Sequence, residues 1–385
     1  MDMKEYRICL DATPIIHGER AVKRNTNNLI SALLSRRPKD YCLIYFDRKG
    51  NTPGRLNLGE HPGATEKVCR IPIRLLLPAW KLAGEPAFER LFGPTDLLYA
   101  TDLHFPPTRK GKIISTIRGA AYLKEDLPIR PDHRKKLLRA FAFARANSDY
   151  FLAVSETTRQ HLLECTDIPE DKIYVVTHGV DPGFMPMGKD TGRHIIKKRY
   201  NIDRPYLLFV GAVSRHKNSD GLISAFHAIA GTAKDLALVF AGPIEINIGK
   251  MLQIEKFTEL RRRIHFLGPV EQGGDILNAL YSASEMLVFP SFYEGWCAPP
   301  LEAMASGTPV VCSDIPAIRE VAGDAAVYFD PYRTDDIAGC IATVLQDGER
   351  RARLVSGGLA HSALYTWDRA AEKLEHVFEE ILLVL

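Results

Sequence analysis

Short apolar runs alternate with amphipathic, helix-like stretches along the whole chain. Near-continuous apolar strands separated by amphipathic helices are typical of parallel sheets that helices cover on both faces. The runs form two groups of six, which predicts an α/β protein with two doubly wound domains. The expected strands are residues 6–10, 41–46, 97–100, 112–117, 150–154 and 172–176, followed by 206–210, 236–241, 263–267, 286–289, 309–312 and 326–329.

The segment 179–193 is rich in Gly, Asp, Pro and Met and has no hydrophobic period, so we expect the domain boundary within it. The two predicted domains are residues 1–185 and 186–365. A length of 385 residues exceeds one ordinary core and agrees with two domains. The remaining residues, 366–385, begin with Thr366-Trp367-Asp368 and continue in a helical pattern.

Composition narrows the class of protein. Charged residues make up 25% and hydrophobic residues 46%, as in ordinary soluble proteins. No apolar run reaches the length of a membrane-spanning helix, and the first residues lack the basic head and apolar core of a signal peptide. The 7 cysteines are scattered without C-x-x-C spacing, which indicates reduced thiols rather than disulfides or a zinc site. We therefore expect a cytoplasmic protein.

The net charge of +3 hides an asymmetry. Residues 1–185 hold 29 Lys/Arg and 22 Asp/Glu, a net of +7, whereas residues 186–385 hold 21 and 25, a net of −4. A basic half suits an anionic partner such as a membrane surface. Residues 70–81 and 134–141 combine cations with apolar side chains, as membrane-docking helices do. Core-facing helices with basic outer faces explain these two segments equally well. We expect no nucleic-acid partner.

The first segment that indicates chemistry follows the strand expected at 206–210. It passes through Gly211, Arg215, Lys217 and Asn218 into a helical pattern, with Asn218 as the predicted N-cap. Free N–H groups at a helix start, the helix dipole and the Lys/Arg charge together favour a bound phosphate. A solvated basic loop is the alternative.

The second segment places two carboxylates, Glu294 and Glu302, eight positions apart around a loop with glycine and proline. Pro299 and Pro300 suit a helix start, and Gly307 suits its end. Glu302 is then expected in the first turn, with its side chain directed back toward the amino end to accept hydrogen bonds from a ribose. The alternative is that Glu302 only stabilises the helix dipole and that Glu294 is an exposed loop acid.

The carboxy-terminal half resembles the donor domain of the retaining family 4 glycosyltransferases. The resemblance is carried by the E-x7-E pair within Pro290–Val311, and Arg215–Asn218, His265–Gly268 and Ala317–Val321 add to it. Weaker matches cover the amino half, at Ala153–Glu156 and His178–Asp181. It implies the GT-B fold: two Rossmann-like domains facing across a cleft, an amino-terminal acceptor domain, a carboxy-terminal donor domain, and a last helix that crosses back to the amino-terminal domain.

The resemblance also implies the reaction and its residues. A sugar is transferred from a nucleoside diphosphate sugar to an acceptor hydroxyl with retention of configuration, without metal or cofactor, because Lys/Arg and helix N-termini neutralise the leaving diphosphate. Glu302 would bind the ribose, Lys217 the diphosphate and Glu294 the transferred sugar, and the base would lie near Val270. The donor-binding set is Gly18, Gly211, Arg215, Lys217, Asn218, Val270, Trp296, Cys297, Ala298, Leu301 and Glu302, and the catalytic pair is Glu294 and Arg118.

Three positions depart from the family pattern. Only Gly18 remains of a glycine-rich loop after the first strand, and Arg118-Gly119 replaces a His-Asp pair after the strand at 112–117. An arginine there can pair with a donor phosphate or an acidic acceptor. The loop Trp296-Cys297-Ala298 differs from the usual Phe-Gly-Leu and predicts a reshaped sugar pocket in which the Cys297 side chain adds bulk.

The sequence therefore predicts a metal-independent retaining hexosyltransferase in surface-polysaccharide or glycolipid assembly, located in the cytoplasm or at the inner face of the membrane. The Arg-x-Lys-Asn loop resembles that of mannosyltransferases, so GDP-mannose is the first donor expected. Two alternatives stay open: a nucleotide-sugar epimerase of the same fold, and a catalytically weak or silent nucleotide-sugar-binding protein. The departures at Gly18 and Arg118 motivate the latter.

Overall fold

The computed structural model describes residues 6–50, 52, 55–56, 58–124, 127, 129–246, 259–270 and 275–384. The chain divides into two compact units. The first unit combines the chain up to Gly179 with the segment from Thr366 onward, and the second unit comprises Val180–Tyr365 together with Leu127. The main chain therefore leaves the first unit after Gly179 and returns to it after Tyr365. The sequence predicted these boundaries after residues 185 and 365.

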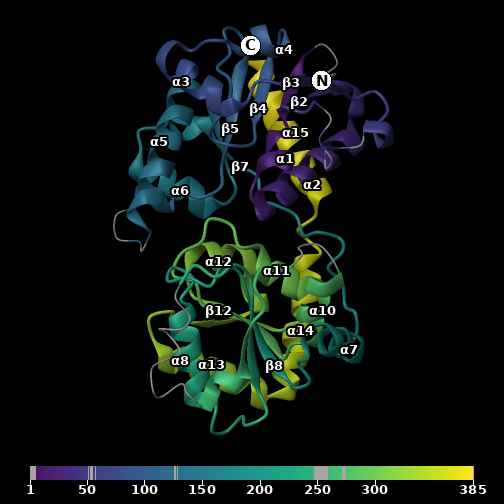
Figure 1. The fold of residues 1–385 in the computed structure, drawn as a ribbon, viewed down its shortest axis with the longest axis vertical. Coiled ribbons are helices and arrows are strands. Elements are labelled where there is room, and N and C mark those ends of the chain that lie inside the picture. The colour runs from purple at the N-terminus through teal and green to yellow at the C-terminus, as the bar shows by residue number, and fades with distance from the viewer. Residues whose placement is uncertain are drawn as a thin grey trace. The chain divides into compact units, whose positions relative to one another are not determined.

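Each unit is built on a parallel sheet (Figure 1). The first sheet has the order β3-β2-β1-β4-β5-β6-β7, and the second has the order β10-β9-β8-β11-β12-β13. The strands are β1 Ile8–Asp11, β2 Tyr41–Phe46, β3 Thr65–Cys69, β4 Leu97–Ala100, β5 Lys112–Ile117, β6 Tyr150–Ala153, β7 Ile173–Val175, β8 Tyr206–Val210, β9 Ala237–Ala241, β10 Ile264–Phe266, β11 Met286–Phe289, β12 Val310–Ser313 and β13 Val327–Phe329. The prediction of two doubly wound α/β domains is confirmed.

The twelve expected strands are all present, but β3 was missed. It is an edge strand whose first three residues, Thr65, Glu66 and Lys67, are exposed. An edge strand that faces water needs no apolar run, so the hydrophobic pattern does not reveal it.

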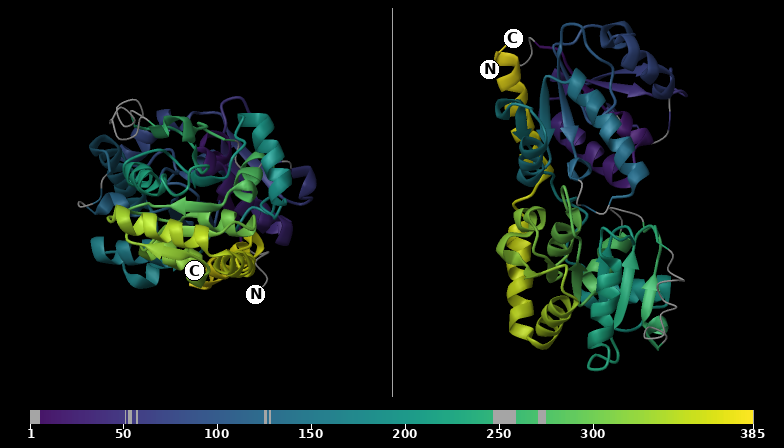
Figure 2. Two further views of the ribbon diagram at one scale, coloured as in Figure 1. Left: turned by 90° about the horizontal axis from the view of Figure 1, so that it is seen from below. Right: turned by 90° about the vertical axis from the view of Figure 1, so that its left-hand side faces the viewer.

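Helices flank both sheets (Figures 1 and 2). In the first unit they are α1 Thr13–His17, α2 Arg20–Arg36, α3 Ile73–Ala83, α4 Phe88–Phe92, α5 Pro131–Asn147, α6 Glu156–Cys165 and α15 Trp367–Leu383. In the second unit they are α7 Lys189–Tyr200, α8 Ser219–Ile229, α10 Asp275–Ala283, α11 Ala298–Ala305, α12 Pro316–Ala322, α13 Thr334–Gln346 and α14 Gly348–Ser362.

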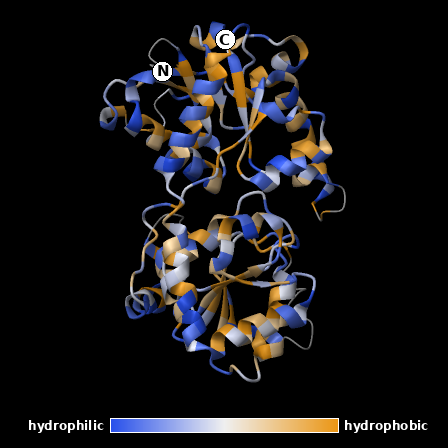
Figure 3. Cartoon of the chain, turned by 180° about the vertical axis from the view of Figure 1, so that it is seen from behind, coloured by the Kyte–Doolittle hydropathy of each residue, from blue (hydrophilic) through white to orange (hydrophobic). Residues whose placement is uncertain are grey.

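Alternate residues of the central strands pack on opposite faces of each sheet. In β1, Ile8 and Leu10 join the core with α2 and α15, whereas Cys9 joins a second core with Trp80 of α3. The strands of the second unit divide in the same way between two cores. Figure 3 shows the resulting hydrophobic strands. Because both faces are covered, the strands read as continuous apolar runs in the sequence.

Helix α15 belongs to the first unit, where it lies along α2 (Figure 1). Thr366 caps it by accepting a hydrogen bond from the Arg369 backbone N–H at 3.2 Å. Gly179 allows the chain to pass close to the start of this helix. A Cβ atom at Gly179 would lie 2.3 Å from the backbone nitrogen of Trp367, so a larger residue there would displace the helix start.

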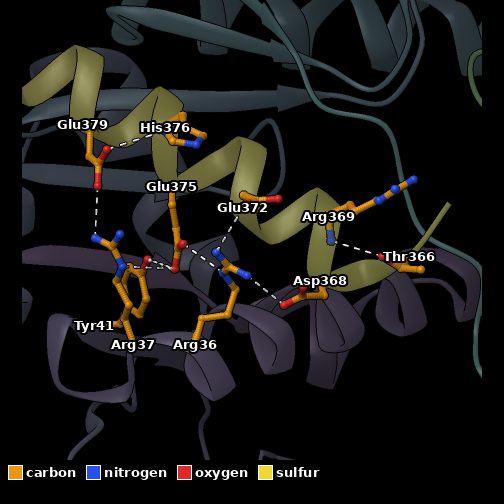
Figure 4. Close-up of polar contacts among 10 residues, drawn as sticks. All are labelled: Arg36, Arg37, Tyr41, Thr366, Asp368, Arg369, Glu372, Glu375, His376 and Glu379. Carbon is orange, nitrogen blue, oxygen red and sulfur yellow. Dashed lines mark hydrogen bonds and ion pairs between the residues drawn. The ribbon is translucent and has the colours of Figure 1, made fainter. Parts of the chain in front are cut away.

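A buried acid ties α15 to the end of α2 (Figure 4). The Glu375 side chain is 3% exposed, and its Oε2 accepts from Arg36 Nε at 2.9 Å. Glu375→Gln is expected to lower the free energy of unfolding by about 2 kcal/mol, less than for a fully buried pair because Arg36 still contacts water. Urea denaturation measures the change.

Glu372 supplies the matched control for that substitution. Its carboxylate is 3.9 Å from Arg36 and 53% exposed. Glu372→Gln should therefore change stability by less than about 0.5 kcal/mol. Equal losses of stability in the two variants would show that the burial of Glu375 does not strengthen its contribution to the free energy of unfolding.

Candidate functional site

The order of the second sheet reverses between β8 and β11, and the loops after these strands begin the site. In doubly wound sheets, ligands bind beyond the carboxyl ends of the strands at such a reversal. The loop after β8 leads into α8 and the loop after β11 leads into α11. The Phe292 backbone N–H donates to the His216 carbonyl at 3.0 Å and joins the two loops.

The loop after β8 has a defined backbone path. Gly211 has φ of 145° and donates its N–H to the Ala241 carbonyl at 3.0 Å. Arg215 is exposed. Asn218 is the N-cap residue of α8 as predicted, but its side chain makes no capping hydrogen bond to the helix. Its backbone is left-handed, with φ of 55°, and its side-chain Nδ2 donates to the Pro331 carbonyl at 2.7 Å.

Lys217 and Glu294 form an ion pair between these two loops, through Lys217 Nζ and Glu294 Oε1. Their side chains are only 17% and 9% exposed, and the ammonium also lies 5.3 Å from the centre of the Phe289 ring. The alternative that Glu294 is an exposed loop acid is therefore wrong. The pair puts a poorly exposed cation beside a poorly exposed carboxylate at the sheet reversal.

Glu302 is buried in α11, at 4% exposure. Pro299 and Pro300 stand near the start of α11 as predicted, but Glu302 is its fifth residue, so the expectation of a first-turn acid is wrong. Glu302 Oε2 accepts from the Tyr281 hydroxyl of α10 at 2.9 Å. A charged hydrogen bond of this kind fixes the direction of the carboxylate. The motif search missed Tyr281 because this residue lies inside an apolar helix pattern.

Tyr281→Phe tests this contact. Because it removes a donor to a buried carboxylate, the free energy of unfolding should fall by about 2 kcal/mol, the upper part of the usual range for one hydrogen bond. Tyr206→Phe is the control, since that hydroxyl donates to the neutral Leu280 carbonyl at 2.8 Å. Chemical denaturation should show the larger loss for Tyr281→Phe; equal losses would contradict a special role for the bond to Glu302.

The loop Trp296–Ala298 and Leu301 expose fewer side chains to the candidate site than the sequence predicted. Trp296 is half-buried, with its ring 5.8 Å from that of Tyr365. The Cys297 thiol donates to the Ala317 carbonyl at 3.6 Å and is 1% exposed, so its side chain does not add bulk to an open pocket. Burial raises the pKa of this thiol well above its usual value. Ala298 is half-buried, while Leu301 and Val270 belong to the core.

Two of the predicted residues, Gly18 and Arg118, lie in the first unit. Gly18 ends α1, and a Cβ atom there would lie 2.4 Å from the Pro14 carbonyl oxygen, so the tight turn alone accounts for the glycine. Arg118 follows β5 and donates through Nη2 to Thr26 Oγ1 at 3.0 Å and to the Thr101 carbonyl at 2.8 Å. The other predicted site residues lie in the second unit.

His178 is a further buried group of the first unit. Its ring lies 5.5 Å from that of Trp367, and Asn25 Nδ2 donates to its Nδ1 at 3.1 Å. Burial lowers the pKa of His178 to about 3, and the charges of Arg118 and Arg24 act in the same direction. The imidazole is therefore neutral near pH 7. No group of three or more His, Cys, Asp or Glu side chains suited to a metal ion occurs in the described part of the chain.

Known proteins resemble both units. Residues 192–360 match the family Glycosyl transferases group 1, and residues 35–184 match Glycosyltransferase Family 4. O-antigen chain mannosyltransferase B of Escherichia coli is 28% identical over 229 residues, which are 59% of this chain and 60% of that protein. The chain thus matches less than two thirds of this relative's length.

Solved structures resemble nearly the whole chain. Sucrose-phosphate synthase from Thermosynechococcus elongatus superposes with a TM-score of 0.73 at 18% identity, covering 99% of this chain and 100% of that one. Anabaena HepE in complex with UDP-glucose superposes with a TM-score of 0.69 at 15% identity, covering 97% and 100%. These likenesses confirm the predicted GT-B fold.

Proposed function

Because the chain belongs to the group 1 glycosyltransferases of family 4, we propose that it transfers a hexose from a nucleoside diphosphate sugar to a hydroxyl of a glycan or glycolipid, with retention of anomeric configuration. The observation that carries this proposal is the Lys217–Glu294 pair at the sheet reversal, beside a helix that holds the buried Glu302.

Each group has one task in this reaction. When the bond between the anomeric carbon and the diphosphate breaks, negative charge develops on the leaving group, and Lys217 stabilises it, with Arg215 and the backbone near Gly211 and Asn218 around it. Glu294 holds the transferred sugar by its hydroxyls. Glu302 accepts from the ribose hydroxyls, and the base lies near Val270.

The leaving diphosphate needs no metal ion in this scheme, because Lys217 supplies the neutralising charge. The backbone of Trp296–Ala298 and the start of α11 line the sugar position, since the Cys297 and Leu301 side chains point into the core. GDP-mannose is the first donor to test. The Arg-x-Lys-Asn loop and the likeness to an O-antigen mannosyltransferase support it. The biological process that fits this donor and this relative is surface-polysaccharide assembly.

A silent nucleotide-sugar binder is the second candidate, favoured by the replacement of the family's His-Asp pair by Arg118-Gly119. A panel of UDP-, GDP- and dTDP-sugars, incubated with pure protein and then with acceptor extracts, separates the two candidates. The transferase should release nucleoside diphosphate from one donor and form a product with the donor's anomeric configuration. Binding without turnover under all conditions would leave the silent binder, and a recovered epimeric nucleotide sugar would indicate an epimerase.

A membrane-facing surface on the first unit fits a lipid-linked acceptor. None of the helices in the described part of the chain combines the length and the apolar character that a bilayer span needs. However, Leu75 and Leu82 of α3 are 65% and 92% exposed, beside the exposed cations Arg74 and Lys81. The outer face of α3 is thus apolar as well as basic, as in helices that lie in a membrane interface.

The double substitution Leu75→Glu/Leu82→Glu is therefore expected to reduce co-sedimentation with anionic phospholipid vesicles at least about fivefold. It removes apolar area that would be buried in the membrane, and the new carboxylates are repelled by the anionic lipids. The exposed Leu364 of the second unit provides the control Leu364→Glu. Similar losses in both variants, or no vesicle binding by the unchanged protein, would contradict this surface.

A further inference from the structure

Two cysteines stand directly opposite each other in the first sheet. Cys9 is the second residue of β1 and Cys42 is the second residue of β2, and the parallel register of the two strands pairs them. Both side chains pack against the same core, which contains Trp80 of α3 and Phe88 of α4. The two thiols therefore lie on the same face of neighbouring strands, although the cysteines are far apart in the sequence and have no C-x-x-C spacing.

The spacing of this cysteine pair suits a disulfide. Neighbouring strands lie about 4.8 Å apart, and disulfides join Cα atoms that are about 4.4 to 6.8 Å apart. Both cysteines are free thiols in the structure, and a hydrogen bond joins their side chains. The backbone of the two strands therefore needs no rearrangement for a bond to form between the two sulfur atoms.

The two thiols differ in access and in acidity. Cys9 is 2% exposed, whereas Cys42 is half-buried and pairs in register with Thr65, an exposed residue of the edge strand β3. The hydrogen bond between the thiols raises the pKa of Cys9, and burial acts in the same direction. The same hydrogen bond lowers the pKa of Cys42 to about 6 against the effect of burial, and the charges of Lys67 and Glu66 act in opposite directions. Cys42 is thus the more accessible thiol and the one that carries the nucleophilic thiolate.

We propose that Cys9 and Cys42 form an oxidative modification site, at which a hydroperoxide such as hydrogen peroxide converts the two thiols into a disulfide. In the first step the Cys42 thiolate attacks one oxygen of the peroxide, the O–O bond breaks, hydroxide leaves, and Cys42 becomes a sulfenic acid. In the second step the Cys9 sulfur attacks the Cys42 sulfur, the S–O bond breaks, and the oxygen leaves as water with the proton of Cys9. The two thiols together lose two electrons, which the peroxide takes up.

The position of the pair within the sheet makes this oxidation reversible. The strands hold the two Cα atoms near the short end of the range that disulfides span, so the bond would be strained. Strained disulfides are reduced more easily than relaxed ones. A small thiol such as glutathione can reach the half-buried Cys42 sulfur from the side of the exposed Thr65 and return the pair to the dithiol form.

The test is brief treatment of the reduced full-length protein with hydrogen peroxide near pH 7, followed by blocking of free thiols, digestion and mass spectrometry of the peptides. The main product should be a Cys9–Cys42 disulfide that glutathione reverses, while the buried Cys312 stays reduced. Cys42→Ser should slow the oxidation of Cys9 at least about tenfold, since the thiolate is the attacking species. Cys9→Ser should leave Cys42 as a sulfenic acid that dimedone traps. Cys165→Ser, which removes an exposed cysteine of α6, is the matched control and should form the disulfide unchanged.

Three outcomes would overturn the proposal: no Cys9–Cys42 disulfide in the unchanged protein, equal oxidation of Cys9 in Cys42→Ser, or no trapped sulfenic acid at Cys42 in Cys9→Ser. Circular dichroism checks that each variant folds, and Cys42→Ala replaces Cys42→Ser if the hydroxyl is not tolerated beside the core. No step of this oxidation uses Lys217, Glu294 or Glu302 of the second unit. The result is therefore independent of whether the protein transfers a sugar.

Discussion

Replacing Glu294 by glutamine is expected to reduce transferase turnover by about 10²–10³-fold, the usual cost of removing one group that stabilises a transition state. Affinity for the nucleoside diphosphate should stay the same or rise. The reason lies in the ion pair: in the free protein Lys217 is held by Glu294, and a neutral side chain at 294 leaves the ammonium available to the diphosphate. Steady-state kinetics and calorimetry with the preferred donor nucleotide measure both effects.

Glu285 provides the matched control for that substitution. It is another poorly exposed acid of the second unit, paired with Lys189 at 2.7 Å and with Arg193 and Arg351. Glu285→Gln should lower stability through these lost pairs and leave turnover per folded molecule unchanged. Full activity in Glu294→Gln, or an equal loss of activity in Glu285→Gln, would refute the role assigned to Glu294.

Replacing Lys217 by methionine is expected to weaken nucleoside diphosphate binding by about 10²-fold, since a charge-assisted contact to phosphate is lost and the Glu294 carboxylate then repels the ligand. Stability should also fall by about 3 kcal/mol, because one partner of a largely buried pair is left without compensation. Calorimetry gives the first quantity and urea denaturation the second.

The double variant Lys217→Met/Glu294→Gln separates the two effects. It removes the uncompensated carboxylate, so stability should largely return, but nucleotide binding should stay weak. Lys189→Met is the single-site control, because its partner Glu285 has two further cations. Unchanged nucleotide affinity in Lys217→Met would mean that the diphosphate binds elsewhere.

Much of the fold was predictable because parallel strands buried on both faces leave continuous apolar runs, as in Tyr206–Val210. The exposed edge strand Thr65–Cys69 was not, since water covers its first residues. The end of the first unit was predicted six residues late. The first unit ends where Gly179 passes close to Trp367, and this approach joins residues far apart in the sequence, so no local pattern reveals it.

The candidate site was predictable to the extent that its groups follow strand ends. Lys217 and Glu294 were expected to serve one ligand, and the structure pairs them. The directions in which the side chains of the site point were not predictable. The left-handed backbone of Asn218 turns its amide to Pro331, and Cys297 turns its thiol into the core. Partners from other helices, such as Tyr281 for Glu302, depend on tertiary packing, which leaves no local motif in the sequence.

A crystal structure of the protein with the nucleoside diphosphate of its preferred donor tests the central claim most directly. The account predicts the diphosphate against Lys217 at the ends of β8 and β11, with the ribose hydroxyls on Glu302 and the base near Val270. A nucleotide bound away from Lys217, or a ribose held by residues other than Glu302, would contradict the assignment of the donor site.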